Sequence, residues 1–296
     1  MTDKIWGIDL GGTKIEGVIL DPGNLTKPVI RERISTESQN GYQHILMRVN
    51  ELVDLIKNKS GLTPDKIGFG TPGILDPALN TMKNCNTTCL NGKPLQKDLS
   101  ELLKIPVQLA NDANCFTLAE SLFGAGKGAN SVFGIIMGTG VGGGIVINGK
   151  LLSGLHGIAG EWGHNILIEG GEPCYCGKSG CVEGVFSGPA LEKYYESISG
   201  NKLSLKEITE AKNDTAALQT MKRLTSSFGK AVSVVINILD PEVIVIGGGL
   251  SNIPELYSDG VSEINKYIFN NGVSTKVVKN NLGDSAGVFG AALLCQ

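Results

Sequence analysis

The chain has 296 residues, a length that suits two domains or one large one, and a formal net charge of -3 at pH 7. With an isoelectric point near 5.7 it has no electrostatic footprint for nucleic acid, and no apolar run approaches the roughly 20 residues of a membrane-spanning helix. Glycine supplies 41 residues, concentrated in a few turns flanked by apolar segments, which is typical of an enzyme whose backbone approaches a ligand closely.

The first half of the chain opens with a glycine-turned hairpin, since apolar residues alternate on both sides of Gly11 and Gly12. Residues 41–60 carry apolar positions at helical spacing, and the strand KIGFG and the turn-rich loop TPGILDP follow them. The segment IPVQLA predicts another strand, which runs into NDANCFTLAESLFG. There Asn111 or Asp112 can begin a helix, because short polar side chains cap its free amides.

The second half repeats the hairpin over residues 131–148, where Phe133 stands 127 residues after Trp6 in an aligned W/F-G-I segment. The repeat suggests two related halves, each opening with a phosphate-sized loop. Residues 216–239 predict a long apolar helix with a mild interruption at Gly229. A buried strand ending in three glycines, VIVIGGGLSN, and a C-terminal glycine-rich helix, GDSAGVFGAALLC, follow. Strands that alternate with helices predict an α/β fold.

Three glycine loops are candidates for binding phosphate, because successive free amides form concavities that bind anions. Their residues are Gly11, Gly12, Thr13, Lys14, Gly138, Thr139, Gly140, Gly247, Gly248 and Gly249. The sequence GTGVGG fits the dinucleotide pattern, but the strand-like continuation lacks the helix which that pattern requires. Each loop alone could be a simple tight turn; the three together favour a nucleotide. Asp9, just before the first loop, could hold Mg²⁺ through water beside the phosphates.

The stretch from Glu161 to Glu183 concentrates residues that can bind a metal ion. The candidate ligands are His164, Cys174, Cys176 and Cys181. Three thiolates and one imidazole make a closed tetrahedral set, which is how proteins hold structural zinc. The alternative is a group of inert thiols or half of a disulfide pair. No basic segment followed by a long apolar run opens the chain, so we expect a cytoplasmic protein whose reduced thiols favour metal.

Taken in order, these motifs resemble the ROK family of sugar kinases and repressors, within the actin-like, ribonuclease H-like phosphotransferases. DLGGTK at 9–14 is similar to the first phosphate motif, GTGVGGG at 138–144 to the second, and GGGLSN at 247–252 to the adenosine motif. NDAN resembles the segment of the catalytic aspartate, and EWGH with CYCGKSGCVE resembles the family's zinc signature. The resemblance spans the whole chain. It implies a two-domain, actin-like ATPase fold with a duplicated core and a zinc-binding insertion.

The resemblance also implies a role for each site residue. Asp112 would be the general base, which takes the proton from a sugar hydroxyl as that oxygen attacks the γ-phosphate of ATP. The implied sugar-binding residues are Gly73, Asn111, Asp112, Glu161, His164 and Glu183. His164 would use one ring nitrogen for the sugar and the other for zinc. From the residues alone, Asp112 could be only a helix cap, and Glu161 and Glu183 could be solvated surface acids.

The substrate implied by the resemblance is a hexose, phosphorylated on its 6-hydroxyl. Residues 84–100 look most like the fructokinase/mannokinase branch, which puts fructose first and adds mannose or glucose. GKPL and NDANCFTLAE are also similar to N-acetylglucosamine kinases, so that activity, or a glucokinase, is the alternative. A sugar-sensing regulator of the family is a third possibility, but a first motif at Asp9 leaves no room for a DNA-binding module.

We expect two α/β domains. The small one covers residues 1–112, and a C-terminal helix at 284–296 returns to it; the larger one covers residues 113–283 and carries the zinc. The expected cofactors are ATP, Mg²⁺ and a structural Zn²⁺. The expected partner is a small-molecule hexose, without nucleic acid or membrane. Homo-oligomers, dimers first, are implied by the resemblance.

Overall fold

The computed structural model describes residues 4–296 and divides into two compact units. Unit 1 takes in the described residues up to Lys127, together with residues 144–159 and 282–296, and unit 2 holds residues 128–143 and 160–281. The expected small domain begins with residues 1–3, which lie outside the described residues. The C-terminal helix is grouped with the N-terminal strands.

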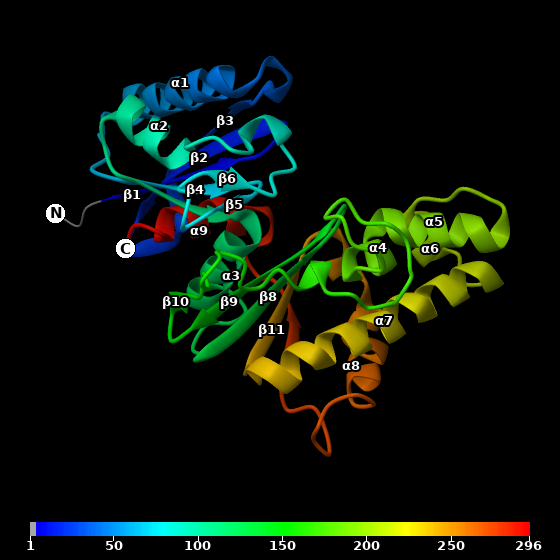
Figure 1. Cartoon of the computed structure of the whole chain (residues 1–296). Coiled ribbons are helices and arrows are strands. Elements are labelled where there is room, and N and C mark those ends of the chain that lie inside the picture. The colour runs from blue at the N-terminus through cyan, green and yellow to red at the C-terminus, as the bar shows by residue number, and fades with distance from the viewer. Residues whose placement is uncertain (1–3) are drawn as a thin grey trace. The chain divides into compact units, whose positions relative to one another are not determined.

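Unit 1 is built on a five-stranded sheet with the order β3-β2-β1-β4-β7 (Figure 1). Its strands are β1 (Ile5–Leu10), β2 (Lys14–Asp21), β3 (Asn24–Ser35), β4 (Ile67–Thr71) and β7 (Val107–Asn111). The first three strands pair antiparallel, and β4 and β7 are parallel to β1. The carboxyl ends of β1, β4 and β7 therefore meet at one edge of the sheet, where ligands bind in open α/β sheets.

Helices cover both faces of this sheet (Figure 1). They are α1 (Tyr42–Ser60), α2 (Leu95–Leu103), α3 (Asp112–Phe123) and α9 (Ala286–Leu293). On one face, α1 and α2 enclose the main apolar core with Ile8, Ile15 and Phe69. On the other face α9 lies directly on the backbone, because Gly7 and Gly68 carry no side chain. A Cβ at Gly68 would lie 1.8 Å from the carbonyl oxygen of Ala291.

The second sheet has the order β10-β9-β8-β11-β12, the same plan as the first sheet. Its strands are β8 (Ser131–Met137), β9 (Val141–Ile147), β10 (Lys150–Leu151), β11 (Val243–Gly247) and β12 (Lys276–Lys279). In both sheets a three-stranded meander is extended by two strands parallel to its first strand. The shared order supports the duplication that the two hairpins predict.

The remaining elements are short except for α7. The other helices are α4 (Val182–Phe186), α5 (Gly188–Ser199), α6 (Leu205–Glu210), α7 (Thr215–Leu239) and α8 (Asp259–Ile264). Single 3-10 turns are η1 (Ser38–Asn40), η2 (Thr88–Leu90), η3 (Trp162–His164), η4 (Gly249–Asn252), η5 (Pro254–Leu256) and η6 (Gly283–Ser285). A small hairpin joins β5 (Ile74–Leu75) to β6 (Met82–Lys83).

The structure confirms the α/β class, both glycine-turned hairpins and the helices predicted at 41–60 and at the C-terminus. The predicted interruption of the long helix at Gly229 is wrong, because α7 is continuous. Gly229 instead allows close packing on α8, where an added Cβ would lie 2.4 Å from the Cβ of Glu263. The TPGILDP loop contains β5, which pairs with β6.

The boundary of unit 1 also differs from the expected boundary at residue 112. The unit includes the whole of α3, because α3 packs against α9. An added Cβ at Gly290 of α9 would lie 1.7 Å from the carbonyl oxygen of Cys115 in α3, so the two helices touch backbone to backbone.

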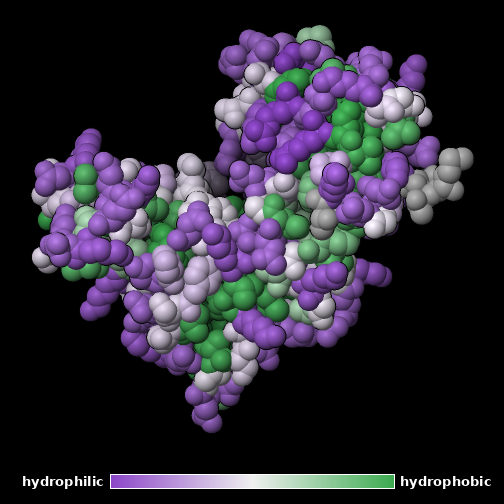
Figure 2. Space-filling model, turned by 180° about the vertical axis from the view of Figure 1, so that it is seen from behind, coloured by the Kyte–Doolittle hydropathy of each residue, from purple (hydrophilic) through white to green (hydrophobic). Residues whose placement is uncertain are grey.

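None of the helices within residues 4–296 combines the length and the apolarity that crossing a lipid bilayer requires. On the face that Figure 2 shows, hydrophilic residues predominate and hydrophobic residues lie among them in smaller groups.

Candidate active site

Two carboxylates stand at the carboxyl edge of the unit 1 sheet. Asp9 lies near the end of β1, and Asp112 is the first residue of α3, directly after β7. Asn111 caps α3, since its side chain accepts a hydrogen bond of 2.8 Å from the N–H of Asn114. The sequence allows either Asn111 or Asp112 as the cap, and in the structure the cap is Asn111. The Asp112 carboxylate therefore does not accept the hydrogen bond that caps α3.

The electrostatics of this edge favour protonated acids. Burial, then the neighbouring charges of Asp112 and Glu16, raise the pKa of Asp9 from 3.8 to about 6, while Lys14 and Arg33 lower it. Burial raises the pKa of the Asp112 carboxyl also, and hydrogen bonds from backbone N–H groups, including Ala113 at 2.8 Å, oppose the rise. The Asp112 side chain nonetheless reaches solvent, which reduces this rise in its pKa. A carboxylate whose pKa is raised accepts a proton more readily.

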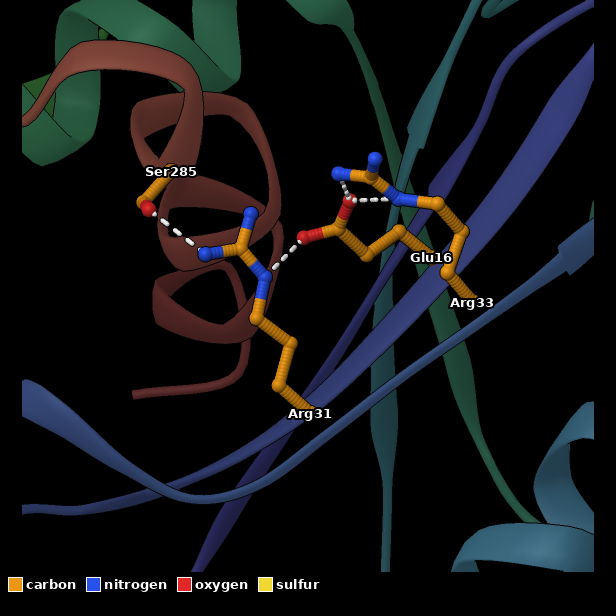
Figure 3. Close-up of polar contacts among 4 residues, drawn as sticks. All are labelled: Glu16, Arg31, Arg33 and Ser285. Carbon is orange, nitrogen blue, oxygen red and sulfur yellow. Dashed lines mark hydrogen bonds and ion pairs between the residues drawn. The ribbon is translucent and has the colours of Figure 1, made fainter.

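A charged network of Glu16, Arg31 and Arg33 (Figure 3) lies next to Asp9 in the strand register. In the strand register Asp9 stands opposite Glu16, and Glu16 stands opposite Arg33. The nearly buried Glu16 side chain forms ion pairs with Arg31 and Arg33, which lie on its two sides. Arg31 also donates to Ser285 over 2.9 Å, which ties β3 to the start of α9. The two arginines therefore offset part of the repulsion between the Glu16 and Asp9 carboxylates.

The first glycine loop is fixed through its carbonyl groups. The hydroxyls of Thr36 and Ser38 donate to the carbonyl oxygens of Gly11 and Gly12 at 2.6 and 2.7 Å. The Thr36 N–H donates to Thr13 over 2.9 Å. Thr13 and Lys14 are both exposed. Holding carbonyl groups from one side orients the peptide planes of the loop, which suits a backbone that must present amides to an anion.

Gly73 is required by its surroundings. An added Cβ would lie 2.3 Å from the sulfur of Cys85 and 2.9 Å from the carbonyl oxygen of Lys83. The Thr71 hydroxyl lies 2.9 Å from the carbonyl oxygen of Gly73 and 3.1 Å from that of Ala110. The turn at Gly73 is thereby anchored to the end of β7, next to Asn111.

In unit 2 the structure brings the second and third glycine loops together. They follow β8 and β11, which are parallel neighbours, so both loops lie at the same edge. The Gly188 N–H at the start of α5 donates to the carbonyl oxygen of Gly138 over 2.9 Å. Gly248 has φ of +77°, and an added Cβ would lie 2.3 Å from the carbonyl oxygen of Met137, so only glycine fits there. Thr139 and Gly249 are exposed beside them.

The predicted metal ligands converge. One donor atom from each of four residues lies within 4.8 Å of the others: His164, Cys174, Cys176 and Cys181. His164 Nδ1 is 3.6 Å from Cys174 Sγ, and Cys176 Sγ is 3.6 Å from Cys181 Sγ. Burial first, then the other thiols, raises the pKa of Cys181 to about 12, so a metal ion has to displace its proton. The donor set fits zinc, which prefers sulfur and nitrogen in tetrahedral geometry.

Trp162, which the sequence analysis did not single out, anchors this segment. Its buried indole packs edge-on against Phe133 at 5.8 Å between ring centres and donates to the carbonyl oxygen of Gly142 over 3.3 Å. The anchor fixes the short 3-10 turn that carries Glu161 before it and His164 at its end. The available signal was an aromatic residue directly after Glu161 and two positions before His164.

Glu183 contacts the second glycine loop. Its Oε2 accepts a hydrogen bond of 2.9 Å from the N–H of Val141, and an added Cβ at Gly140 would lie 2.6 Å from the same oxygen. Glu183 also follows the predicted metal ligand Cys181 by two residues. The structure therefore connects the metal-binding segment with a candidate phosphate loop through one carboxylate.

The predicted site residues fall into two groups. Those up to Asp112 lie in unit 1, and those from Gly138 to Gly249 lie in unit 2. Within unit 1, the charge of Asp112 contributes to the raised pKa of Asp9. Within unit 2, the ligand cluster, Glu183 and the two glycine loops form one connected set. Glu16, Trp162 and Tyr175, which contacts His164, were not predicted from the sequence.

Known proteins match the whole chain. The model of the ROK family matches residues 5–296. The N-acetyl-D-glucosamine kinase of Vibrio atlanticus is 37% identical over 301 residues, which cover 98% of each chain. The ROK hexokinase structure from Thermus thermophilus has a TM-score of 0.87 and 30% identity, covering 98% of this chain and 97% of that one. The ROK family glucokinase from Streptomyces griseus, solved with glucose and AMPPNP, has a TM-score of 0.80 and 28% identity over 98% of both chains.

Proposed function

The chain belongs to the ROK family and is a sugar kinase, and on this premise we propose that it transfers the γ-phosphate of ATP to the 6-hydroxyl of a hexose. The observation that carries this proposal is the pair of carboxylates, Asp9 and Asp112, beside an ordered glycine loop at the carboxyl edge of one sheet. Phosphoryl transfer needs positioning and neutralisation of charge more than covalent chemistry, and this set of groups can supply both.

In the proposed reaction Asp112 accepts the proton of the attacking sugar hydroxyl. Its raised pKa and its exposure suit a group that must meet substrate and take up a proton. The glycine loops bind phosphate oxygens through backbone N–H groups, which place no further charge beside the nucleotide. Asp9 is the residue that would hold Mg²⁺, and the ion would offset the negative charge of the phosphates.

We propose that Asn111, Glu161, His164 and Glu183, with the backbone at Gly73, bind the sugar hydroxyls. Carboxylates and an imidazole suit a polyol, because each offers strong acceptors or a directional donor. The four-ligand cluster would hold zinc as a structural ion. Its contribution is to fix His164 and the segment that ends at Glu183, rather than to take part in the transfer.

N-acetylglucosamine is the first substrate to test, because a relative 37% identical over 98% of both chains bears the name of its kinase. Glucose is the next, from the glucokinase and hexokinase names of the structural relatives. Fructose, which the sequence of residues 84–100 favours, stays a prediction. A regulatory role without catalysis is the second class of function, and the paired carboxylates argue against it.

The test is a coupled ADP-release assay with ATP and Mg²⁺ across N-acetylglucosamine, glucose, mannose, fructose and N-acetylmannosamine. We expect ADP release that depends on sugar, with at least one sugar preferred by about tenfold or more in kcat/KM, the scale on which pockets resolve single substituents. Mass spectrometry of the product should find one phosphate on the 6-hydroxyl. Sugar binding by calorimetry without any turnover would overturn the kinase and favour the regulatory role.

A further inference from the structure

The two ring nitrogens of His164 have different partners. Nδ1 faces the thiol cluster, 3.6 Å from Cys174 Sγ, and Nε2 lies 3.0 Å from the hydroxyl oxygen of Tyr175. The two rings meet edge to face, with 5.2 Å between their centres and an angle of 88°. If Nδ1 binds the metal ion, Nε2 is the only ring atom left to bond a sugar hydroxyl. In the structure the Tyr175 hydroxyl already contacts Nε2.

Tyr175 lies beside His164, one of the proposed sugar-binding residues. It lies between the candidate ligands Cys174 and Cys176, so a bound metal ion fixes its backbone on both sides. The residue is 66% exposed, so its side chain is free to turn into solvent.

We propose that Tyr175 is a specificity-determining residue, whose hydroxyl occupies the sugar-facing nitrogen of His164 until a sugar hydroxyl displaces it. This inference rests on the proposed function, because it takes His164 as a sugar-binding residue. A sugar that bonds Nε2 has to break the Tyr175 bond first, so its net gain is only the difference between the two hydrogen bonds. A sugar that presents no hydroxyl there leaves the Tyr175 bond in place and has no such cost. The exchange therefore lowers the affinity only of sugars that bond His164 and reduces the preference for them.

The experiment compares the wild type with Tyr175→Phe, which removes the hydroxyl and keeps the ring. Tyr267→Phe is the matched control, because it removes a partly exposed phenol hydroxyl from another part of unit 2. Sugar affinity is measured by titration calorimetry without nucleotide, and kcat and KM are measured separately. Zinc content is measured for each variant to show that the cluster is intact.

We expect Tyr175→Phe to bind the preferred sugar about 3- to 10-fold more tightly, the equivalent of one hydrogen bond that no longer has to be exchanged. KM should fall by a similar factor while kcat and zinc content stay as in the wild type. The preference for that sugar over one that presents no hydroxyl to Nε2 should widen by the same factor. Tyr267→Phe should change none of these quantities.

Weaker binding by Tyr175→Phe would overturn the inference, because it would mean that the phenol contacts the bound sugar directly. Unchanged affinity and preference would overturn it also, since the contact would then have no part in recognition. Both results leave the kinase assignment intact if the wild type turns over. A wild type that neither binds nor phosphorylates any sugar would remove the proposed function, and this inference with it.

Discussion

Replacing Asp112 with Asn tests the proposed base with little disturbance of the fold. The structure explains why. The Asn amide has nearly the same shape, and its oxygen can still accept the 2.8 Å hydrogen bond from the N–H of Ala113. The cap of α3 is provided by Asn111 and stays in place. The change also removes a charge that raises the pKa of Asp9, so the carboxylate that we propose to hold Mg²⁺ is more fully ionised.

The expected loss is one of rate. A positioned general base contributes about 10²- to 10⁴-fold, which at 1.36 kcal/mol for each factor of ten is about 3 to 5 kcal/mol of barrier. Sugar affinity should change by less, because an amide still bonds a hydroxyl. The free energy of unfolding should change by less than about 1 kcal/mol, since Asp112 is exposed and its backbone contact is kept.

The assay measures kcat and KM for ADP release with the preferred sugar, and thermal unfolding checks the fold. Asp54→Asn on the exposed side of α1 is the matched control, because it removes the same charge from the same unit. A kcat for Asp112→Asn within about threefold of the wild type would refute the role of Asp112 as base. A large loss of kcat in Asp54→Asn would show that activity depends on the charge of unit 1 in general.

Three further predictions concern the metal cluster, the Glu16 network and Asp9. Cys181→Ser should abolish zinc binding in metal analysis and lower the thermal midpoint by several degrees, because Cys181 is the buried ligand; retained zinc would contradict the assignment. Glu16→Gln should cost about 1 to 2 kcal/mol in urea unfolding, less than the 3 to 5 of a fully buried pair. The reason is that the side chains of Arg31 and Arg33 are 34% and 48% exposed and can be solvated. An unchanged free energy of unfolding would mean that the network does not stabilise the fold. Asp9 has a pKa near 6 in the folded state against 3.8 in the unfolded chain, so protonation of Asp9 stabilises the fold. This stabilisation is complete below pH 3.8 and is lost as the pH rises through 6. In Mg²⁺-free protein the free energy of unfolding of Asp9→Asn should therefore rise by about 3 kcal/mol relative to that of the wild type between those two pH values. Parallel curves of unfolding free energy against pH for the two proteins would contradict this prediction.

Local signals in the sequence predicted much of the fold. The hairpin at Gly11 and the helix at 41–60 follow from periodicity, since a side-chain period of two or of 3.6 is written directly into neighbouring residues. The duplication was visible as two similar hairpins, and the two sheets share one strand order. The metal cluster was predictable for the same reason, because its four ligands lie within one short stretch of chain.

Other features were decided only by tertiary structure, because they join residues far apart in sequence. Nothing near Gly68 indicates that α9 will lie on it, more than 200 residues later, at a distance that admits no side chain. The packing of α3 against α9 likewise moved the boundary of unit 1 beyond residue 112. Contacts of this kind depend on how elements pack, and packing is a property of the assembled core.

The polar contacts of the site divide in the same way. The sequence by itself determined which groups are available: the carboxylates at Asp9 and Asp112, the glycine loops and the sulfur-rich segment. Tertiary structure decided what those groups touch, including Glu16 beside Asp9, Glu183 on the N–H of Val141, and Tyr175 on His164. Residue type fixes the chemistry that a side chain can perform, whereas hydrogen bonds and charge interactions depend on distances of a few ångströms that only the folded chain sets.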